Sequence, residues 1–354
     1  MGHCMHAAVK TADGKFDLQE VDTPHIARPD WVVARVRVSG ICGTDLRHWK
    51  KAEAPLTGKI MGHELAGEIV EIGSNVTNVK VGDRVVIETL LGDETCDWCR
   101  VQQYNLCPHL YEVRMKTLSQ AFAQYVAGPS AKFYRLPDHV SFEEATLLDT
   151  FSVGLHAMNL SGIKLNDKVA VIGAGPIGLG QLQLAKLAGA DVIITDVVDS
   201  ALEMAGELGA DAVVNTDKED GYQKVMEFTK GRGVDIAFEC AGGPSMPVTL
   251  PQAVSFSRIG GKVVIVGGFD AGVTNIGLEW QRIQMSEIQL ISSASYAYRD
   301  IYPEMQICLD LLAKGQMNAR KMITHSFPLS EINKAFEVAA DKTKTHAIFV
   351  ALTI

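Results

Sequence analysis

Hydrophobic and polar positions follow two different patterns along the chain. Before about residue 150, short runs alternate apolar and polar residues, as in WVVARVRVSG (31–40) and ELAGEIVEIG (64–73), and Gly-Asp or Ser-Asn turns separate them. Alternation with a period of two is typical of half-buried antiparallel strands. We therefore expect a barrel-like β domain in this first part of the chain.

Continuous apolar runs replace the alternation beyond about residue 155. KVAVI (168–172), DVIITD (191–196), VDIAFE (234–239) and GKVVIV (261–266) are separated by segments of helical period. Strands that are buried on both faces read as continuous apolar runs, and their alternation with helices is typical of parallel sheets. The sequence therefore predicts an α/β protein with a doubly wound parallel sheet from about 155 to 290.

The length of the chain also favours more than one domain. With 354 residues it is longer than one compact core usually supports. Beyond the predicted sheet, the tail contains the strand-like run ITHSFPL (323–329) and the helical run EINKAFEVAA (331–340). We expect three segments, with the bounds 1–154, 155–290 and 291–354.

The charge of the chain limits the kinds of partner. The formal net charge is −9 and no run of Lys and Arg occurs, so we expect neither a nucleic acid nor a membrane as partner. No apolar stretch is long enough to span a bilayer, and the N-terminal residues lack the apolar core of a secretion signal. We expect a cytoplasmic protein, in which the seven cysteines fit reduced thiols and metal ligands better than disulfides.

A glycine motif lies where the first strand of the predicted sheet meets the next helix. Gly173, Gly175 and Gly178 form G-x-G-x-x-G directly after KVAVI, with Pro176 and Ile177 between the last two glycines. The first glycine allows a tight turn, the second lets a pyrophosphate approach the backbone, and the third allows close packing of the helix. The motif predicts a dinucleotide at the N-terminus of this helix.

The end of the second strand indicates which dinucleotide binds. DVIITD ends in Asp196, and no Arg follows it within the next three residues. An acid at this position accepts hydrogen bonds from ribose hydroxyls and repels a 2′-phosphate, so we expect NAD rather than NADP. The alternative is a solvated acid at a strand end. Ligands of such sheets lie at the carboxyl ends of the strands, so the residues expected to border the cofactor are Cys240, Ala241, Gly267 and Gly268.

Two separate pieces of the first part carry possible metal ligands. Cys42 follows a strand in GICGTDLRHW, and His63 and Glu64 lie further along in MGHELAG. Sulfur, imidazole and carboxylate are ligand types that zinc accepts. A buried thiol and a core imidazole are the alternative. A buried carboxylate, however, is costly unless it is paired or binds a cation, which favours a metal site.

These residues carry a resemblance to a known family. The pattern G-H-E-x2-G-x5-G-x2-V spans residues 62–76, VGDRVV (81–86) follows it, and KTHAIFV (344–350) lies near the end. With the glycine motif at its expected distance, nearly the whole chain resembles the zinc-containing medium-chain dehydrogenase/reductase family, the relatives of alcohol, sorbitol and threonine dehydrogenases. The resemblance implies a GroES-like antiparallel β-barrel catalytic domain, built from both chain ends, and a Rossmann domain that binds NAD.

The resemblance also implies a catalytic zinc. Cys42, His63 and Glu64 match the positions of its ligands. In LLDTFSVGLHAM (147–158), polyol dehydrogenases carry Glu-Pro where this chain has Asp149 and a threonine, and alcohol dehydrogenases place a cysteine ligand there. Asp149 keeps the carboxylate but is one methylene shorter, so it binds the zinc directly, binds it through water, or caps a nearby helix.

A proton relay is implied next to this zinc. Thr44 matches the hydroxyl residue that takes the proton of the substrate, and Asp45 beside it is expected to be structural. Many relatives carry a histidine where this chain has Arg47, which cannot act as a base. Either His48 takes part in the relay, or the proton leaves through water.

The cysteine cluster GDETCDWCRVQQYNLC (92–107) resembles a second, structural zinc lobe of the family. The family pattern is Cys-x2-Cys-x2-Cys-x7-Cys, and its positions fall here on Asp93, Cys96, Cys99 and Cys107. A carboxylate oxygen is an accepted zinc ligand, so one carboxylate and three thiolates complete a closed tetrahedral site that contributes to folding. A lobe without metal and a disulfide are the alternatives.

The run SVGLHA (152–157) resembles the polyol branch of the family more than the threonine branch. We therefore expect reversible, NAD-dependent oxidation of a secondary hydroxyl of a polyol, cyclitol or sugar derivative to the ketone, with Tyr298 and Arg299 near the substrate. The alternatives are an amino-alcohol dehydrogenase similar to threonine 3-dehydrogenase, a zinc-free quinone reductase, and a crystallin-like structural or binding protein. A homodimer or homotetramer is expected, because the segments 263–268 and 272–293 suggest pairing of sheet edges between subunits.

Overall fold

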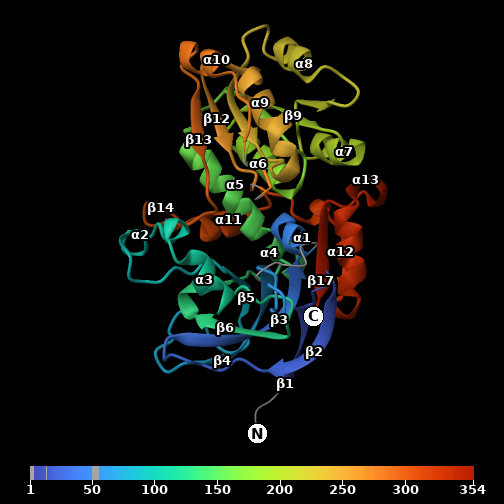
Figure 1. The fold of residues 1–354 in the computed structure, drawn as a ribbon. Coiled ribbons are helices and arrows are strands. Elements are labelled where there is room, and N and C mark those ends of the chain that lie inside the picture. The colour runs from blue at the N-terminus through green and yellow to red at the C-terminus, as the bar shows by residue number, and fades with distance from the viewer. Residues whose placement is uncertain (1–3, 13, 50–55, 269, 271, 274) are drawn as a thin grey trace. The chain divides into compact units, whose positions relative to one another are not determined.

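The computed structural model describes residues 4–12, 14–49, 56–268, 270, 272–273 and 275–354 (Figure 1). The chain forms two compact units. The first comprises the residues up to Asp149 with Asp300–Gly315 and Ala319–Ile354, and the second comprises Thr150–Arg299 with Gln316–Asn318. The boundaries between the units lie at 149/150 and 299/300. The sequence pattern predicted them at 154/155 and 290/291. The pattern marks where strands begin, and it does not show on which unit a connecting helix packs.

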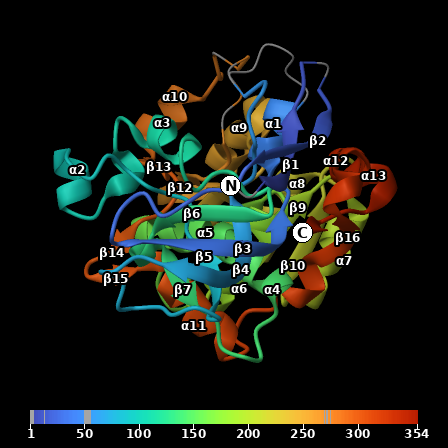
Figure 2. The ribbon, with the colours of Figure 1, turned by 90° about the horizontal axis from the view of Figure 1, so that it is seen from below.

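The alternating runs of the first unit form mainly antiparallel strands. β1 (Cys4–Lys10) and β2 (Phe16–Asp22) pair as a separate ribbon. A seven-stranded sheet has the order β16-β17-β3-β4-β5-β7, with β6 paired to β3. Its strands β3, β4, β5 and β6 are labelled in Figure 2. Its strands are β3 (Trp31–Gly40), β4 (Glu64–Ile72), β5 (Arg84–Ile87), β6 (Tyr125–Pro129), β7 (Phe133–Arg135), β16 (Ile323–Pro328) and β17 (Phe349–Thr353). Its pairs are antiparallel except β16 with β17, which confirms the predicted β domain.

The two ends of the chain meet in this unit. β17 pairs antiparallel with β3, and Ala351 lies opposite Gly40. Phe16, Phe122 and Phe336 pack together with ring centroids 4.7 to 6.0 Å apart. Because these rings come from the beginning, middle and end of the sequence, one hydrophobic core holds all three segments. This confirms that one unit is built from both chain ends.

Short helices complete the first unit. The helix α4 (Phe142–Thr146) shows how local sequence fixes their starts: Ser141 Oγ accepts a hydrogen bond from the backbone N–H of Glu144, and the Glu144 carboxylate accepts one from the N–H of Ser141. The others are α1 (Gly43–Trp49), α2 (Asp97–Arg100), α3 (Leu110–Met115), α11 (Glu304–Ala313), α12 (Ile332–Ala340) and α13 (Lys342–Thr345), with the 3₁₀ turns η1 (Tyr104–Leu106), η2 (Ser130–Lys132), η4 (Arg320–Met322) and η5 (Leu329–Glu331) and the short strand β15 (Tyr302–Pro303).

A parallel sheet with the order β10-β9-β8-β11-β12-β13 forms the second unit. Its strands are β8 (Lys168–Ile172), β9 (Asp191–Asp196), β10 (Ala212–Asn215), β11 (Val234–Glu239), β12 (Ser257–Ile265) and β13 (Gln289–Ser292). All pairs are parallel, which confirms the doubly wound prediction. The strand order reverses between β8 and β11, and ligands of such sheets bind at the carboxyl ends of the strands at this point.

Helices connect the strands of the second unit in the order expected from the sequence pattern. They are α5 (Leu148–Ser161), α6 (Pro176–Leu187), α7 (Asp199–Glu207), α8 (Gly221–Phe228), α9 (Met246–Phe256) and α10 (Trp280–Met285), with the turn η3 (Gly243–Ser245) and the short strand β14 (Tyr298–Arg299). In the part of the chain that the structure describes, no helix combines the length and hydropathy needed to cross a bilayer.

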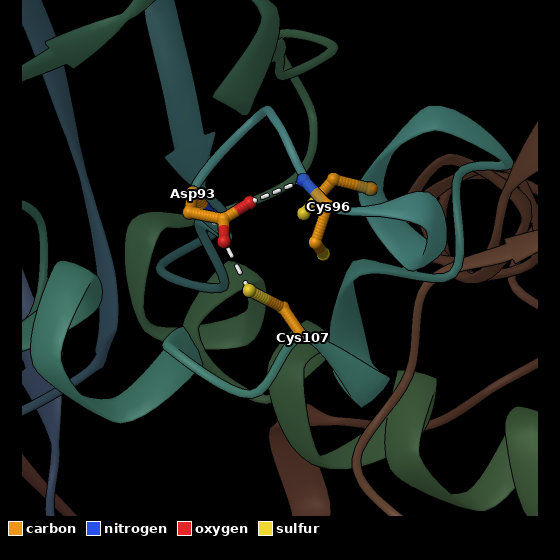
Figure 3. Close-up of side chains that lie close together, drawn as sticks. Asp93, Cys96 and Cys107 are labelled. Carbon is orange, nitrogen blue, oxygen red and sulfur yellow. Dashed lines mark hydrogen bonds between the residues drawn. The ribbon is translucent and has the colours of Figure 1, made fainter.

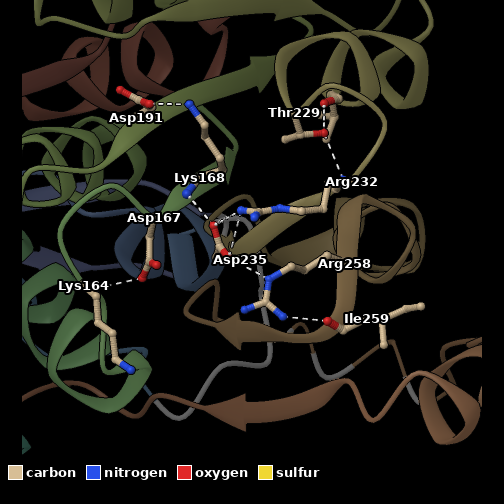
Figure 4. A network of polar contacts seen from close by, with 11 residues as sticks. Lys164, Asp167, Lys168, Asp191, Thr229, Arg232, Asp235, Arg258 and Ile259 are labelled. Carbon is tan, nitrogen blue, oxygen red and sulfur yellow. Dashed lines mark hydrogen bonds and ion pairs between the residues drawn. The ribbon is translucent and has the colours of Figure 1, made fainter.

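A polar network joins the amino ends of three strands of this sheet (Figure 4). Asp235 in β11 accepts hydrogen bonds from the backbone N–H of Lys168 in β8 (2.7 Å) and from Nε of Arg258 in β12 (2.6 Å), and it lies 3.3 Å from Arg232. Burial acts to raise the pKa of Asp235, but Arg258 and the other donors outweigh it and lower that pKa. This end of the sheet is therefore held by ion pairs, and the carboxyl ends carry the glycine motif.

Candidate active site

The end of β3 and the start of β4 bring three predicted metal ligands together. Gly40 pairs with Glu64 in the register of these strands, so Cys42 lies beside His63 and Glu64. The Cys42 thiol, a ring nitrogen of His63 and a carboxylate oxygen of Glu64 lie within 4.8 Å of one another. His63 and Glu64 are buried and Cys42 is half-buried. The antiparallel pairing thus joins residues that are far apart in the sequence.

Helix α1 supplies two side chains that contact the His63 ring. Oδ1 of Asp45 lies 3.6 Å from Nδ1 of His63, and Oγ1 of Thr44 lies 3.3 Å from Nε2. Oδ2 of Asp45 accepts a hydrogen bond from the backbone N–H of Cys42 (3.0 Å). A carboxylate behind a ligand imidazole usually fixes the ring orientation and tautomer. Asp45, expected only to be structural, therefore holds both ligand segments of the site.

The three clustered groups disturb one another's protonation. Burial acts to raise the pKa of the Cys42 thiol, but the charge of His63 outweighs it and lowers that pKa. Burial acts to lower the pKa of His63, yet the charges of Asp45 and Cys42 raise it well above its ordinary value. Burial and then the charge of Cys42 raise the pKa of Glu64 well above its ordinary value. A divalent cation would stabilise thiolate and carboxylate together, so these residues fit zinc.

Two other predicted residues lie close to this cluster. Asp149 is buried at the start of α5, and its charge contributes to the raised pKa of Glu64. Its carboxylate is outside the set of atoms that lie within 4.8 Å of one another, so direct ligation by Asp149 stays a prediction. His48 in α1 lines a cavity together with Thr44 and His63.

This cavity has a volume of about 200 Å³, and its wall includes residues that no sequence motif indicated. Tyr111, Arg114 and Met115 of α3 and Ser119 after it line the cavity beside the metal cluster. They reach it because the backbone N–H groups of 121 and 122 donate to the carbonyls of 62 and 61 (3.2 and 2.9 Å). The sequence pattern did not reveal this pairing, which places the segment after α3 beside the site.

The predicted cysteine lobe also assembles (Figure 3). One ligand atom each of Asp93, Cys96, Cys99 and Cys107 lies within 4.8 Å of the others. Oδ1 of Asp93 accepts hydrogen bonds from the backbone N–H groups of Thr95 and Cys96 (2.9 Å each). The backbone N–H of Asp93 donates to Sγ of Cys107 (3.4 Å). The acid at the first position therefore forms the turn that presents the first two thiols.

Charge and protonation in this lobe are consistent with a metal site. Its backbone hydrogen bonds, from Cys96 first and Thr95 second, hold the pKa of Asp93 well below its ordinary value, so this ligand is anionic. Burial raises the pKa of Cys99 to about 12, with a contribution from its hydrogen bond to Cys96. All seven cysteines are free thiols in the structure, so the disulfide alternative is not adopted here. A closed zinc site fits one carboxylate and three thiols that lose their protons on binding.

A buried ion pair that no sequence motif indicates anchors the lobe. Glu88 is fully buried and accepts hydrogen bonds from Nζ of Lys132 (2.8 Å), from the hydroxyl of Tyr134 (2.7 Å) and from the hydroxyl of Tyr104. Nζ of Lys132 also lies 3.5 Å from the centre of the Tyr104 ring. Because Tyr104 lies between Cys99 and Cys107 in the chain, this pair fixes the lobe to the sheet.

The glycine motif forms the predicted turn between β8 and α6. Gly173 has φ +98°, and a Cβ there would lie 2.8 Å from the backbone nitrogen of Ala241. A Cβ on Gly178 would lie 1.8 Å from the carbonyl oxygen of Gly173. Gly175 is the N-cap of α6, and Pro176 is its first residue. Gly173 and Gly178 thus each have a steric reason, and Ile177 follows in the first turn of the helix.

Asp196 lies at the end of β9, next to this turn. Its Oδ2 accepts a hydrogen bond from the backbone N–H of Ala174 (2.6 Å), and its Oδ1 accepts from those of Val197 (2.7 Å) and Val198 (2.9 Å). These bonds fix the carboxylate beside the glycine turn, where an acid that selects NAD belongs.

The other expected cofactor residues lie at the carboxyl ends of β11 and β12. Cys240 donates its backbone N–H to the carbonyl of Ile172 at the end of β8 (2.8 Å), and Ala241 lies against Gly173. The carbonyl of Gly268 accepts a hydrogen bond from Gly243 (2.7 Å), and Gly267 lies just before it. Burial first, and then the charge of Glu239, raise the pKa of the Cys240 thiol well above its ordinary value, in line with a packed residue rather than a nucleophile.

The two expected substrate residues form β14. Tyr298 is half-buried and Arg299 is exposed. Both belong to the second unit, whereas the metal cluster belongs to the first. Their contact with substrate stays a prediction.

A doubly wound sheet and a β unit that gathers Cys, His and Glu side chains together define a zinc-dependent dehydrogenase. Residues 28–138 match the alcohol dehydrogenase GroES-like domain, and residues 176–313 match the zinc-binding dehydrogenase family. The chain belongs to the zinc-containing medium-chain dehydrogenases, which confirms the family predicted from its motifs.

Individual relatives match over nearly the whole chain. D-arabitol-phosphate dehydrogenase of Enterococcus avium is 38% identical over 95% of each chain. Sorbitol dehydrogenase of Bacillus subtilis is 34% identical over 95% of this chain and 93% of its own. The short chain alcohol dehydrogenase rspB of Escherichia coli CFT073, solved with NADH, superposes with a TM-score of 0.86 at 25% identity over the full length of both chains.

Proposed function

We propose that this protein oxidises a secondary hydroxyl of a polyol to the ketone with NAD as the hydride acceptor, reversibly. The observation that carries the proposal is the cluster of Cys42, His63 and Glu64, whose ligand atoms lie within 4.8 Å of one another beside a cavity. The names of D-arabitol-phosphate dehydrogenase and sorbitol dehydrogenase support a polyol as substrate.

Cys42, His63 and Glu64 would hold a zinc ion, which as a Lewis acid would favour loss of the proton from a hydroxyl in the cavity. Thr44 is the residue that receives this proton, because its hydroxyl lines the cavity, lies 3.3 Å from His63 and can both accept and donate. His48 lines the same cavity and passes the proton on, a role that Arg47 cannot take. Asp149 is proposed to act at the same centre, through its effect on Glu64 or as a further ligand.

NAD binds at the carboxyl ends of β8, β9 and β11 in this proposal. Gly173, Gly175 and Gly178 admit the pyrophosphate to the N-terminus of α6. Asp196, fixed by Ala174, accepts hydrogen bonds from the ribose hydroxyls. The NADH present in the structure of rspB supports the same cofactor class. Tyr298 and Arg299 are proposed to contact the substrate.

A second zinc held by Asp93, Cys96, Cys99 and Cys107 is proposed to be structural. Its four donors gather in one place, and a tetrahedral site filled by them has no open position for a substrate. It would therefore contribute to folding rather than to chemistry.

The protein is further proposed to be a cytoplasmic homodimer or homotetramer. The parallel sheet ends in the edge strand β13, and edge strands invite pairing with another chain. Ile259, Trp280 and Met285, in and near the neighbouring elements β12 and α10, are large apolar side chains that are 64–78% exposed. A second copy covering them would remove this apolar surface from water.

A substrate screen tests the proposed function. NADH formation is measured with zinc-quantified protein on sorbitol, arabinitol, galactitol, inositol, their phosphate esters, and L-threonine. The proposal predicts that polyols or their esters exceed L-threonine in kcat/KM. Preference for L-threonine would favour the amino-alcohol alternative, and no turnover with any alcohol would contradict the proposal.

A further inference from the structure

The wall of the cavity that α3 provides carries two hydrogen-bond donors with no role in holding the metal. Arg114 comes from the last turn of α3, and Ser119 follows it. The carbonyl of Arg114 accepts the backbone N–H of Ser119 (3.0 Å), so the two residues are fixed relative to each other. The pairing of residues 121–122 with 61–62 then places this wall beside His63.

Arg114 has a charge that the described part of the protein does not neutralise. Its guanidinium makes no hydrogen bond or ion pair with any residue that the structure describes, and its Nε is buried. Glu112, the acid in the same helix, is paired instead with Lys116 (2.6 Å). A buried donor on a cation is costly unless a partner satisfies it. The cavity is where a partner for Arg114 can enter.

Ser119 supplies a second buried hydrogen-bond donor that has no partner among the described residues. Its side chain is 2% exposed, and its hydroxyl has no hydrogen-bond partner among the described residues. Buried hydroxyls in native proteins are nearly always hydrogen-bonded, so an unsatisfied one that lines a cavity indicates a missing ligand group.

Among the described residues that line the cavity, no carboxylate is available to pair with Arg114. Asp45 is the carboxylate among the lining residues, and it is engaged by the backbone of Cys42 and by His63. From α3, the apolar Met115 and the phenol of Tyr111 also line the cavity. The wall formed by α3 and Ser119 therefore presents donors and a positive charge, which is the chemistry of an anion site.

We propose that Arg114 and Ser119 form a subsite for a terminal oxyanion of the substrate, so that the enzyme acts on polyols that carry a phosphate ester or a carboxylate. This inference rests on the proposed polyol dehydrogenase function. A guanidinium edge and a hydroxyl together offer donors to two or three oxygens, which suits phosphate in particular. The cavity volume of about 200 Å³ lies below the roughly 300–1,000 Å³ of pockets for drug-sized ligands, as expected for a small substrate.

Kinetics with matched substrates test the subsite. We compare kcat/KM for sorbitol against sorbitol 6-phosphate, for arabinitol against its phosphate, and for L-idonate as the carboxylate. The wild-type protein should prefer an anionic substrate over its neutral counterpart. In Arg114→Met, kcat/KM for that anionic substrate should fall roughly ten- to hundredfold, because hydrogen bonds to charged groups are lost. The loss on the neutral polyol should be at least tenfold smaller, Arg114→Lys should restore part of the activity, and Ser119→Ala should give a smaller loss of the same kind.

Lys116→Met is the matched control. It removes the same charge two residues further on, at the C-cap of α3, but Lys116 is 70% exposed and pairs with Glu112, so kcat/KM for the anionic substrate should change by less than twofold. Calorimetric titration of the preferred anionic substrate supplies a readout that does not require turnover, and Arg114→Met should weaken binding by the same factor. A preference for phosphates or for L-idonate identifies which oxyanion binds. Equal use of neutral and anionic polyols, or equal losses for both in Arg114→Met, would overturn the subsite while leaving the polyol dehydrogenase function intact.

Discussion

Replacing Asp196 by Asn should exchange part of the NAD preference for NADP. The carboxylate accepts three backbone hydrogen bonds, from Ala174, Val197 and Val198. Asn keeps one oxygen for Val197 and Val198, so the end of β9 should hold its shape. It removes the negative charge and the acceptor that faces Ala174. The change therefore tests the charge of this side chain with little change in its volume.

The expected magnitude follows from the bonds that the carboxylate offers to the ribose. A hydrogen bond to a charged group contributes about 1.5–3 kcal/mol, which corresponds to roughly a ten- to hundredfold increase in the Kd for NAD. Two unit charges about 4 Å apart near a protein surface interact by about 4 kcal/mol. Loss of the repulsion between Asp196 and a 2′-phosphate should therefore lower the Kd for NADP. The ratio of the two affinities should change by at least a hundredfold.

Fluorescence titrations of NADH and NADPH measure both constants. Asp191→Asn serves as the control, since Asp191 lies at the opposite end of the same strand and pairs with Lys168. This variant should leave the ratio of affinities unchanged. If Asp196→Asn bound both dinucleotides as the wild type does, the assignment of Asp196 to the ribose would be refuted.

Three further substitutions test other parts of the structure. Gly178→Ala should abolish measurable NADH binding by fluorescence, because the new Cβ would lie 1.8 Å from the carbonyl oxygen of Gly173. Lys132→Met should lower the free energy of unfolding in urea by roughly 3–5 kcal/mol, because it leaves Glu88 buried without its cation; a loss below 1 kcal/mol would contradict this. Cys107→Ser should remove one zinc per chain in metal analysis and lower Tm. An unchanged zinc content would rule out the second metal site.

The sequence predicted those parts of the fold that depend on local pattern. The alternating run 31–40 became β3 without a change of bounds, and the glycine motif forms the turn at Gly173 because its steric needs are local. The resemblance to the family's zinc lobe implied that the thiols of Cys96, Cys99 and Cys107 gather, and Asp93 joins them at the first position of that pattern.

Long-range packing set the parts that could not be predicted. Arg114 and Ser119 line the cavity next to a segment whose backbone pairs with residues 61–62. Glu88 and Lys132 are far apart in the sequence, and no sequence motif predicts that they form a buried ion pair. From sequence alone, a single charged residue outside a motif is expected to lie at the surface. The structure was therefore needed to find the buried pair of Glu88 and Lys132 and the position of Arg114 at the cavity.

The central claim is that Cys42, His63 and Glu64 hold the zinc ion on which oxidation of the substrate depends. Anomalous X-ray diffraction at the zinc edge from crystals of the purified enzyme measures this directly. We expect a zinc peak within about 2.0–2.3 Å of Sγ of Cys42, a ring nitrogen of His63 and a carboxylate oxygen of Glu64, and no peak there in the inactive Cys42→Ser variant. A fully active enzyme with no zinc peak at these three residues would contradict it.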